Sequence, residues 1–456
     1  MKQLLFMVIL TLLGTIGCLM RPFYGVAVYY MFAVLRPQYI WQWSLPPDIQ
    51  WSRFVAVATL ISVLVLGPSF HINFSRRERE VPIKSSNLRV MDGVGLSHIL
   101  FGLNFFWISL CYATANNRDV AFDYFNEYLK IFLMILVATA TVRRVSDAWV
   151  LLVIAALSLA YVAYEVNSLY ISSGYAGIYH NGYGGLDNNG AGLMLAMGVP
   201  LCLAIWDTWQ SRWRWSVLVL VLVLIHAVLM TYSRGAMLSL IVGSPWLVCR
   251  SRHRLQIGGV VVLTCLVLVP LMAGPEIRNR FLSIQEHEVD DSANSRKQSW
   301  TAAWNIALDN PVFGVGIRNA NLFSQQYGAD MEGRTIHNNY LQIAADEGFI
   351  GCGLYLAMLG SVWLDLRILR RHRRRSGSLE ARQIHGIAYG VEGAMVLFSF
   401  GAVFLSLENF ELPFLLLLIG AQTTLLVRVE ERWARSGMLN ITDKCSSLVS
   451  NAMTCR

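Results

Sequence analysis

A histidine lies among amide and aromatic side chains in the longest polar interval of this chain. His337 is followed directly by Asn338, Asn339 and Tyr340. Histidine takes up a proton near neutral pH, which suits it to work as a general base, and neighbouring amides can orient its ring. A single histidine more often packs or faces solvent. We interpret His337 as a candidate catalytic base, with Asn338 and Tyr340 as candidate substrate-binding residues.

Three arginines are candidates for binding an anionic group. Arg234 lies in a very short turn between two apolar runs, whereas Arg296 and Arg318 share the polar interval of His337. The planar guanidinium group matches the geometry of phosphate and pyrophosphate. An unpaired arginine at the lip of two membrane helices is costly, so an anion should compensate Arg234. The open alternative is that Arg234 reaches lipid phosphates or pairs with an acidic neighbour.

The next candidates follow a glycine-rich segment, Tyr183-Gly184-Gly185-Leu186. Here Asp187 and Asn188 precede an apolar run. Asp and Asn are preferred helix N-caps, and helix N-termini attract anions. Capping alone explains these residues, and a ligand contact can be added to it. We therefore include both among the candidate substrate-binding residues.

The sequence contains one group of hard metal ligands, but we predict neither a metal site nor a cofactor. The group is Glu286, His287, Glu288, Asp290 and Asp291. Oxygen ligands of this kind suit divalent cations, yet acidic runs in loops are mostly solvated. The eight cysteines form no Cys-x-x-Cys pair, so neither a zinc site nor a disulfide framework is indicated.

The composition indicates an integral membrane protein. Of the 456 residues, 55% are hydrophobic and only 14% are charged, and the mean hydropathy is +0.47. A soluble domain carries about 25% charged residues. The net charge of +8 comes from short basic clusters between apolar runs, which are typical of cytoplasmic loops. We therefore predict membrane lipids, and not nucleic acid, as partners.

Apolar runs that meet or approach the length of a bilayer crossing occur throughout the chain. They cover residues 3–20, 23–35, 54–70, 93–114, 129–142, 148–164, 190–206, 216–232, 235–249, 257–273, 349–364, 384–406 and 413–427. Because every second loop from residue 75 onward is basic, we assign those loops to the cytoplasm. The external loops are then 115–128, 165–189, 233–235, 274–348 and 407–412.

The expected fold is all-α: a polytopic membrane protein of about 12 transmembrane helices with a large helical periplasmic loop, 274–348. We treat 3–20 and 23–35 as one long or broken span, because 23–35 is too short to cross alone. Residues 1–435 then form a single integral membrane domain, and residues 436–456 a cytoplasmic tail. Within the loop, apolar spacing predicts a helix over 301–308 that ends at Asn310-Pro311.

Several short motifs follow one another in a distinctive order. Ser233-Arg234-Gly235 is followed by Gly314-x-Gly316, by His337-Asn338-x-Tyr340-Leu341, and by a closing Glu-Gly-Phe-Ile-Gly at 347–351. In this order the motifs resemble the O-antigen ligase and polymerase superfamily, and most closely the bacterial O-antigen ligases. The shared region extends from about residue 190 to 430. The segments 21–25 and 35–39 are also similar to a branch of the superfamily associated with exopolysaccharide and protein-sorting loci.

The resemblance implies an inverting, metal-independent glycosyltransferase of the bacterial inner membrane, with its active site facing the periplasm. Its donor would be a glycan on undecaprenyl diphosphate, and its acceptor a lipid A-core sugar hydroxyl, in lipopolysaccharide synthesis. His337 would then be the base, and Arg234, Arg296 and Arg318 would bind the diphosphate, in that order of preference. An O-antigen polymerase and a protein O-oligosaccharyltransferase are the alternatives within this class.

A transporter of lipid-linked glycans is the alternative from another class. It should place charged groups midway along its helices, facing a cavity. The spans contain few such groups, namely His98, His226 and Glu392. We interpret these three residues as polar contacts between helices. The remaining charges gather in the loops, which favours an enzyme at the membrane surface.

Overall fold

The computed structural model of the protein describes residues 2–46, 49–68, 94–264, 266, 291–372 and 378–435. The described part of the chain is helical and contains no strand. Several features expected from the sequence lie outside it: loop residues 274–290 with most of the acidic group, the basic clusters at 76–89 and 373–375, and the tail 436–456.

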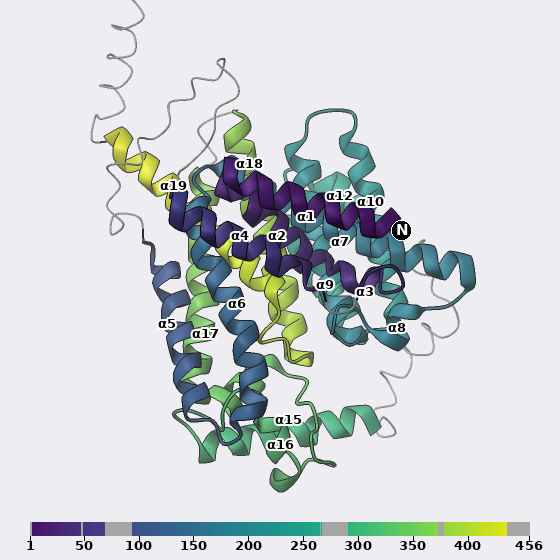
Figure 1. Cartoon of the computed structure of the whole chain (residues 1–456). Helices are drawn as coiled ribbons and strands as arrows, with labels where there is room; N and C mark the ends of the chain where they lie inside the picture. The colour runs from purple at the N-terminus through teal and green to yellow at the C-terminus, as the bar shows by residue number, and fades with distance from the viewer. Residues whose placement is uncertain are drawn as a thin grey trace, which may run out of the picture.

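Seven helices within the described ranges are long and apolar enough to cross a membrane. They are α1 (Lys2–Met20), α5 (Leu96–Ala113), α7 (Val145–Ser173), α9 (Asn188–Thr208), α17 (Asn339–His372), α18 (Leu379–Gly401) and α19 (Glu411–Arg435). Shorter apolar helices are α4 (Trp51–Leu66), α10 (Arg214–Met230) and α12 (Arg254–Leu263). The other helices of ten or more residues are α2 (Pro22–Leu35), α6 (Arg118–Thr141), α11 (Arg234–Arg250) and α15 (Asp291–Asp309). The expected all-α, multi-pass membrane fold is confirmed (Figure 1).

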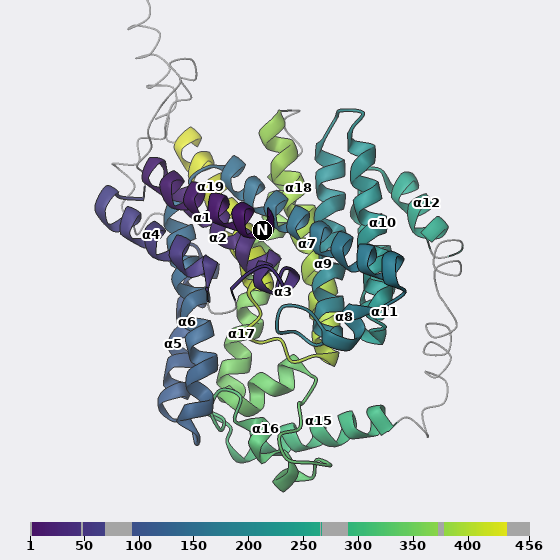
Figure 2. The ribbon, with the colours of Figure 1, turned by 45° about the vertical axis from the view of Figure 1, so that its right-hand side comes forward.

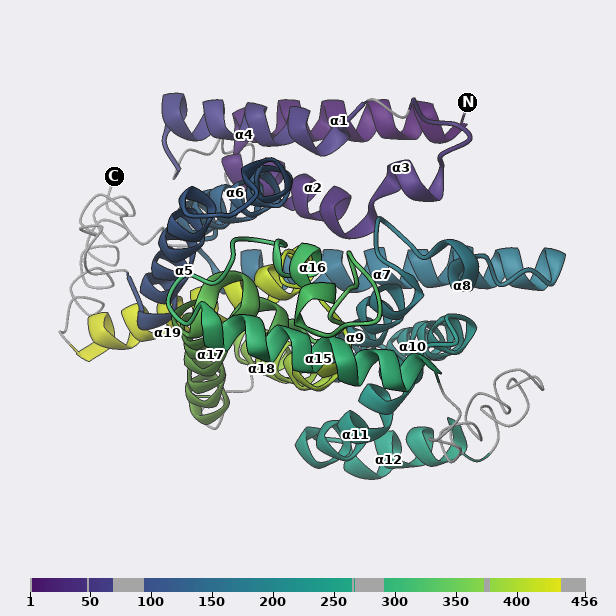
Figure 3. The ribbon, with the colours of Figure 1, turned by 90° about the horizontal axis from the view of Figure 1, so that it is seen from below.

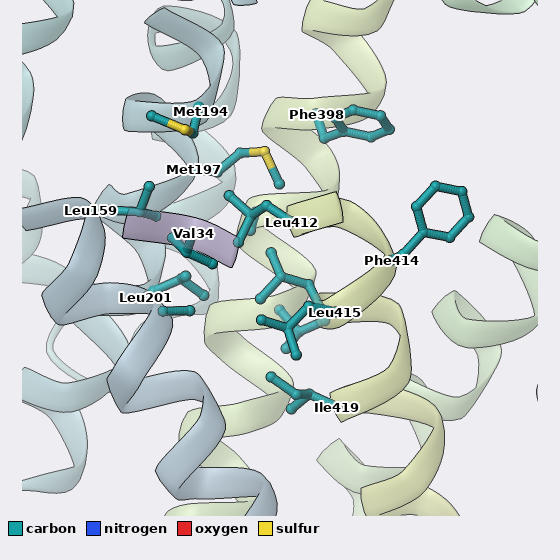
Figure 4. Close-up of a cluster of buried hydrophobic side chains, with 14 of the residues drawn as sticks. Val34, Leu159, Met194, Met197, Leu201, Phe398, Leu412, Phe414, Leu415 and Ile419 are labelled. Carbon is teal, nitrogen blue, oxygen red and sulfur yellow. The ribbon is translucent and has the colours of Figure 1, made fainter. Parts of the chain in front are cut away.

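The centre of the bundle is α9, whose residues from Gly190 to Thr208 are all buried. It packs against α7, α10, α11 and α18. Small residues allow α18 to approach closely, since a Cβ on Gly390 would lie 2.9 Å from Ala204 Cβ, and one on Gly393 would lie 2.7 Å from Pro200 Cβ. Such contacts between small residues are the usual basis of helix packing in membranes. Figure 4 shows apolar side chains of α2, α7, α9, α18 and α19 meeting in this core.

The N-terminal helices correct one expectation. Residues 3–20 and 23–35 do not form one span, because the chain reverses at Arg21-Pro22 and α2 packs back against α1. A Cβ on Gly14 would lie 2.9 Å from Val28, and one on Gly17 would lie 3.3 Å from Tyr24. The glycines allow the two helices to pack closely as an antiparallel hairpin, an option that the length of each run did not reveal.

Loops of the described chain gather at two ends of the bundle. At one end, Asn116 N donates to Val315 O (3.0 Å), and Leu407 N donates to the Asn339 side chain (2.9 Å). We call this end, where α9, α11 and α17 begin, the loop end. At the opposite end, Arg428 pairs with Asp365 (3.0 Å).

The three ionisable residues expected to join helices do so. His98 on α5 lies 3.0 Å from the Gln422 side chain on α19. His226 on α10 lies 2.6 Å from the Asn167 side chain on α7. Glu392 on α18 pairs with Arg370 on α17 at 3.0 Å. Each buried polar group therefore has a partner on a neighbouring helix, and these interpretations are confirmed.

Candidate functional site

The described part of the large loop folds across the loop end. Figures 1, 2 and 3 show α15 running crosswise to α17 at this end. The expected helix over 301–308 is part of α15, which ends at Asp309, directly before Asn310-Pro311. A small apolar core of its own holds this loop to α17; the core comprises Ala303, Ile306, Val315, Ala320, Ile336 and Ala345. The loop is thus a packed layer that can hold side chains in fixed positions.

The Gly314-x-Gly316 turn docks onto the first segment of α17. Val315 N donates to Ala345 O (3.0 Å), and Gly316 N donates to Asp346 O (2.9 Å). Gly314 has a φ of 64°, and a Cβ there would clash with the backbone of Ala345 and Asp346. Only glycine permits this approach. The expectation that these glycines form a turn is confirmed, and the turn sets the position of Arg318.

The residues after His337 build the beginning of α17. The Asn338 side chain caps the helix by accepting hydrogen bonds from the amides of Tyr340 and Leu341, both at 3.1 Å. The Asn339 side chain donates to the Tyr355 hydroxyl (3.2 Å), besides accepting from Leu407 N. The Tyr340 hydroxyl donates to Ser399 O on α18 (2.8 Å). In this structure, therefore, Asn338 and Tyr340 support the helix that follows His337.

His337 lies within an unusual distribution of charge. Its ring is partly buried, and this burial, reinforced by the nearby Arg296 guanidinium, lowers the pKa of the imidazole below its ordinary value of 6.5. The Asp187 carboxylate acts in the opposite direction and raises the pKa, whereas Arg334 and Arg318 lower it further. The structure thus brings His337 into electrostatic contact with three residues predicted from sequence: Asp187, Arg296 and Arg318. The net effect favours a neutral imidazole at pH 7, which can accept a proton.

The N-termini of α9 and α11 meet beside His337 and the charged residues around it. Asp187 caps α9 by accepting a hydrogen bond from Gly190 N (2.7 Å), as the sequence predicted. The Asn188 side chain donates to Thr231 O (3.0 Å), which fixes the turn before Arg234. Arg234 is the first residue of α11 and is partly exposed. Two helix N-termini, each positive, therefore flank Arg234 and favour an anion at this position.

Arg318 has a different environment from the other two arginines. Its guanidinium forms an ion pair with Glu408 (Nε to Oε1, 3.0 Å), in which the Glu408 side chain is only 2% exposed. Gln342 also accepts a hydrogen bond from Arg318 (3.4 Å) and donates to Asp346 (2.7 Å). The Tyr124 ring lies 5.2 Å from the guanidinium carbon. These contacts compensate much of the Arg318 charge within the protein and join the large loop to the segment before α19.

We expect Glu408→Gln to destabilise the protein markedly. Glutamine keeps the shape of the side chain but leaves the Arg318 charge in the interior without its counter-charge, and breaking such a pair costs about 3–5 kcal/mol. The thermal midpoint of the purified protein in detergent measures the effect. The double variant Arg318→Gln/Glu408→Gln removes both charges and should recover part of the loss. An unchanged midpoint for Glu408→Gln would show that the ion pair contributes little.

Backbone strain is concentrated at the same end. Among the residues that the structure describes, four non-glycine residues have a positive φ: Arg36 (42°), Tyr232 (50°), Arg318 (60°) and His337 (53°). A left-handed conformation costs roughly 1–2 kcal/mol for a residue with a Cβ. Such residues cluster at functional sites, where the surroundings hold them in place. Their grouping around His337 and Arg234 marks this region as the candidate active site.

Sequence reasoning missed several residues of this arrangement. Arg334 acts on His337 from three residues away, Glu408 pairs with Arg318, and Asn339 accepts from Leu407 N. The Asn-Asn pair after His337 was a signal for Asn339. Glu408 lies in the short segment before α19, but its distance of 90 positions from Arg318 gave no sign of the pairing. In the described ranges, no three His, Cys, Asp or Glu residues are grouped to hold a metal ion.

Residues 220–356 match the family model described as O-antigen ligase. The matched segment includes Arg234, Arg296, Arg318 and His337, whereas Asp187 and Glu408 lie outside it. The resemblance noted from the motifs is therefore confirmed for this segment. No curated protein matches the sequence.

Proposed function

We propose, from the match of residues 220–356 to the family model described as O-antigen ligase, that this protein is an O-antigen ligase. It transfers O-polysaccharide from undecaprenyl diphosphate to a lipid A-core sugar hydroxyl at the periplasmic face of the bacterial inner membrane. One observation carries the proposal most directly: a partly buried histidine with a lowered pKa lies among arginines at the loop end of a membrane bundle. A base beside cations is what a glycosyl transfer from a lipid diphosphate requires.

In the proposed reaction, His337 removes the proton from the acceptor hydroxyl. The acceptor oxygen attacks the anomeric carbon of the donor and inverts its configuration, and the bond from that carbon to the diphosphate oxygen breaks. The electron pair of that bond leaves with undecaprenyl diphosphate, whose negative charge grows in the transition state. No metal ion is needed, because the leaving group is stable as an anion when cations surround it.

The three arginines stabilise this negative charge from different positions in the site. Preorganised cations contribute most where charge develops in the transition state. Arg234, between two helix N-termini, is placed to bind the diphosphate, and Arg296 approaches His337 from α15. Arg318 remains part of the proposed anion site, in a supporting position, since Glu408 holds it within the protein. Asp187, Asn188, Asn338 and Tyr340 fix the elements that surround the donor.

We expect opposite shifts of the pH profile when the charges around His337 are changed. A base must be unprotonated, so kcat/KM should fall as the pH drops through the pKa of His337 in the free enzyme. Because Asp187 raises that pKa and Arg296 lowers it, Asp187→Asn should move the acid limb to lower pH, and Arg296→Gln should move it to higher pH. The measurement is kcat/KM against pH for the three proteins. If the acid limbs of all three proteins coincide, the ionisation that causes the limb belongs to a group other than His337.

The test of the proposed function is a reconstituted transfer assay. Purified protein is incubated with undecaprenyl-diphosphate-linked glycan and lipid A-core in the presence of EDTA, and the products are separated by gel. The proposal expects a glycan conjugated to lipid A-core. Longer lipid-linked chains would identify a polymerase instead, and glycan attached to a protein acceptor would identify an oligosaccharyltransferase. Binding of the glycolipid without any new glycosidic bond would support a transporter.

A further inference from the structure

The turn that ends α2 is distant in sequence from the family-matched residues 220–356, yet in the folded protein it contacts segments of the candidate site. Arg36 occupies the left-handed C-cap of α2, and its amide donates to Phe32 O (2.8 Å). Glycine usually takes this position because a Cβ is strained there. Pro37 follows and begins the short helix α3 (Pro37–Ile40). An arginine in such a position indicates that its side chain has a use which offsets the strain.

The Arg36 side chain joins two segments of the loop end. Its Nη1 donates to Gly184 O, and its side-chain stem lies so close to Gly184 that a Cβ there would be 2.5 Å from Arg36 Cδ. On the other side, the guanidinium carbon lies 5.9 Å from the centre of the Phe410 ring. The Tyr183 hydroxyl adds a hydrogen bond to Leu35 O. The turn therefore contacts both the segment 182–187 and the segment 405–411.

Both segments lead directly to the candidate site. The segment 182–187 is closed by paired hydrogen bonds between Tyr183 and Leu186 (2.9 and 3.0 Å) and ends at Asp187. The segment 405–411 contains Leu407, which binds Asn339 two positions after His337. The same segment approaches α9, since a Cβ on Gly190 would lie 3.3 Å from Leu407 Cδ2.

We propose that Arg36 is a positioning residue of the active site: it holds the segments 182–187 and 405–411 together, so that Asp187 stays beside His337. The inference rests on the proposed glycosyl transfer. It extends the working site to the N-terminal helical hairpin, outside the matched residues 220–356. Arg36 acts through these segments and touches no reacting atom. The competing explanation is that Arg36 is an interfacial cation that binds lipid head groups, as arginines at helix ends often do.

Two variants distinguish these explanations without removing a large side chain. Arg36→Lys keeps the positive charge, and hence the attraction to head groups, but lacks the planar fork that both donates to a carbonyl and stacks on a ring. Gly184→Ala keeps Arg36 but displaces its stem, and because Gly184 has a φ of 64° it also strains the segment 182–187 itself. It therefore tests the position of that segment, whereas Arg36→Lys tests the arginine. Arg53→Lys is the matched control, since Arg53 is an exposed arginine in the first turn of α4, a helix that packs against α1 and α2.

The experiment measures kcat, KM and the acid limb of kcat/KM in the transfer assay, with wild type as reference. Misplacement of a site by about 1 Å can lower a rate by roughly 10²-fold, so Arg36→Lys and Gly184→Ala should lower kcat on the order of 10-fold to 100-fold. The charges that face His337 are Asp187, Arg296 of α15, Arg318 and Arg334. If Asp187 retreats, the acid limb should move to lower pH, as expected for Asp187→Asn. Arg53→Lys should change neither quantity.

The outcomes separate this inference from the proposed function. If wild type forms no glycosidic bond, the proposed function itself is wrong. If wild type is active and Arg36→Lys retains its kcat and its acid limb, the interfacial explanation replaces the positioning role. Both variants could instead have a lower thermal midpoint and a smaller fraction of active protein, while the acid limb of their kcat/KM profile stays as in wild type. Arg36 would then stabilise the fold without positioning Asp187, and the inference would likewise be overturned.

Discussion

His337→Gly is expected to reduce the transfer rate by about 10²-fold or more, because it removes the group that takes the acceptor proton. The same substitution should leave the fold intact. His337 has a φ of 53°, and glycine adopts this conformation without the steric cost that a Cβ brings. The variant should therefore have a thermal midpoint equal to or above that of the wild type. Loss of activity together with retained or increased stability separates chemistry from folding.

The matched control is His180→Ala. His180 is an exposed residue of the short helix α8 (Gly177–Asn181), outside the group of charges around His337. Its substitution should leave the rate unchanged. A second variant, His337→Asn, suits the left-handed backbone and offers an amide that can bind the acceptor hydroxyl but not take its proton. If His337→Asn were as active as wild type, His337 would position the acceptor and another group would be the base.

The parts of the fold that the sequence predicted depend on local patterns. The cap at Asp187, the end of the loop helix before Asn310-Pro311 and the turn at Gly314 to Gly316 each follow from residue preferences over a few positions. These predictions agree with the structure because no contact with a distant segment overrides the local preferences.

The parts that could not be predicted depend on contacts between distant residues. Arg318 reads in the sequence as a third free cation, but a carboxylate from the segment before α19 compensates it. Arg36 and Gly184, 148 positions apart, have no sequence pattern that links them. The hairpin of α1 and α2 was missed for a similar reason, since the length of a run says nothing about which helix packs on it. Which residues belong to the candidate site depends on how distant segments pack against each other, and a single sequence does not show which residues are paired in this way.

Arg234→Ala is expected to lower kcat/KM by about 10²-fold or more, with most of the loss in kcat. The diphosphate gains charge as the glycosidic bond breaks, so a cation fixed beside it stabilises the transition state more than the bound donor. Arg234→Lys should recover only part of the rate. Lysine keeps the positive charge but binds phosphate as a point charge, without the paired hydrogen bonds that the guanidinium group donates. The measurement is kcat and KM for the donor, with inhibition by added undecaprenyl diphosphate as a second readout.

The control for Arg234 is Arg118→Ala, since Arg118 is also the first residue of a helix at the loop end. Arg118 is exposed, and its guanidinium donates to Ala113 O (2.7 Å) on the protein surface, so its loss should leave kcat/KM unchanged. Arg234 differs because the N-terminus of α9 lies beside its own helix, with Asn188 bonded to Thr231 O. If Arg234→Ala raised KM alone, the arginine would bind donor and transition state equally. If both arginine variants lost activity alike, the effect would reflect general charge at the loop end, and the diphosphate site would have to be sought around Arg296.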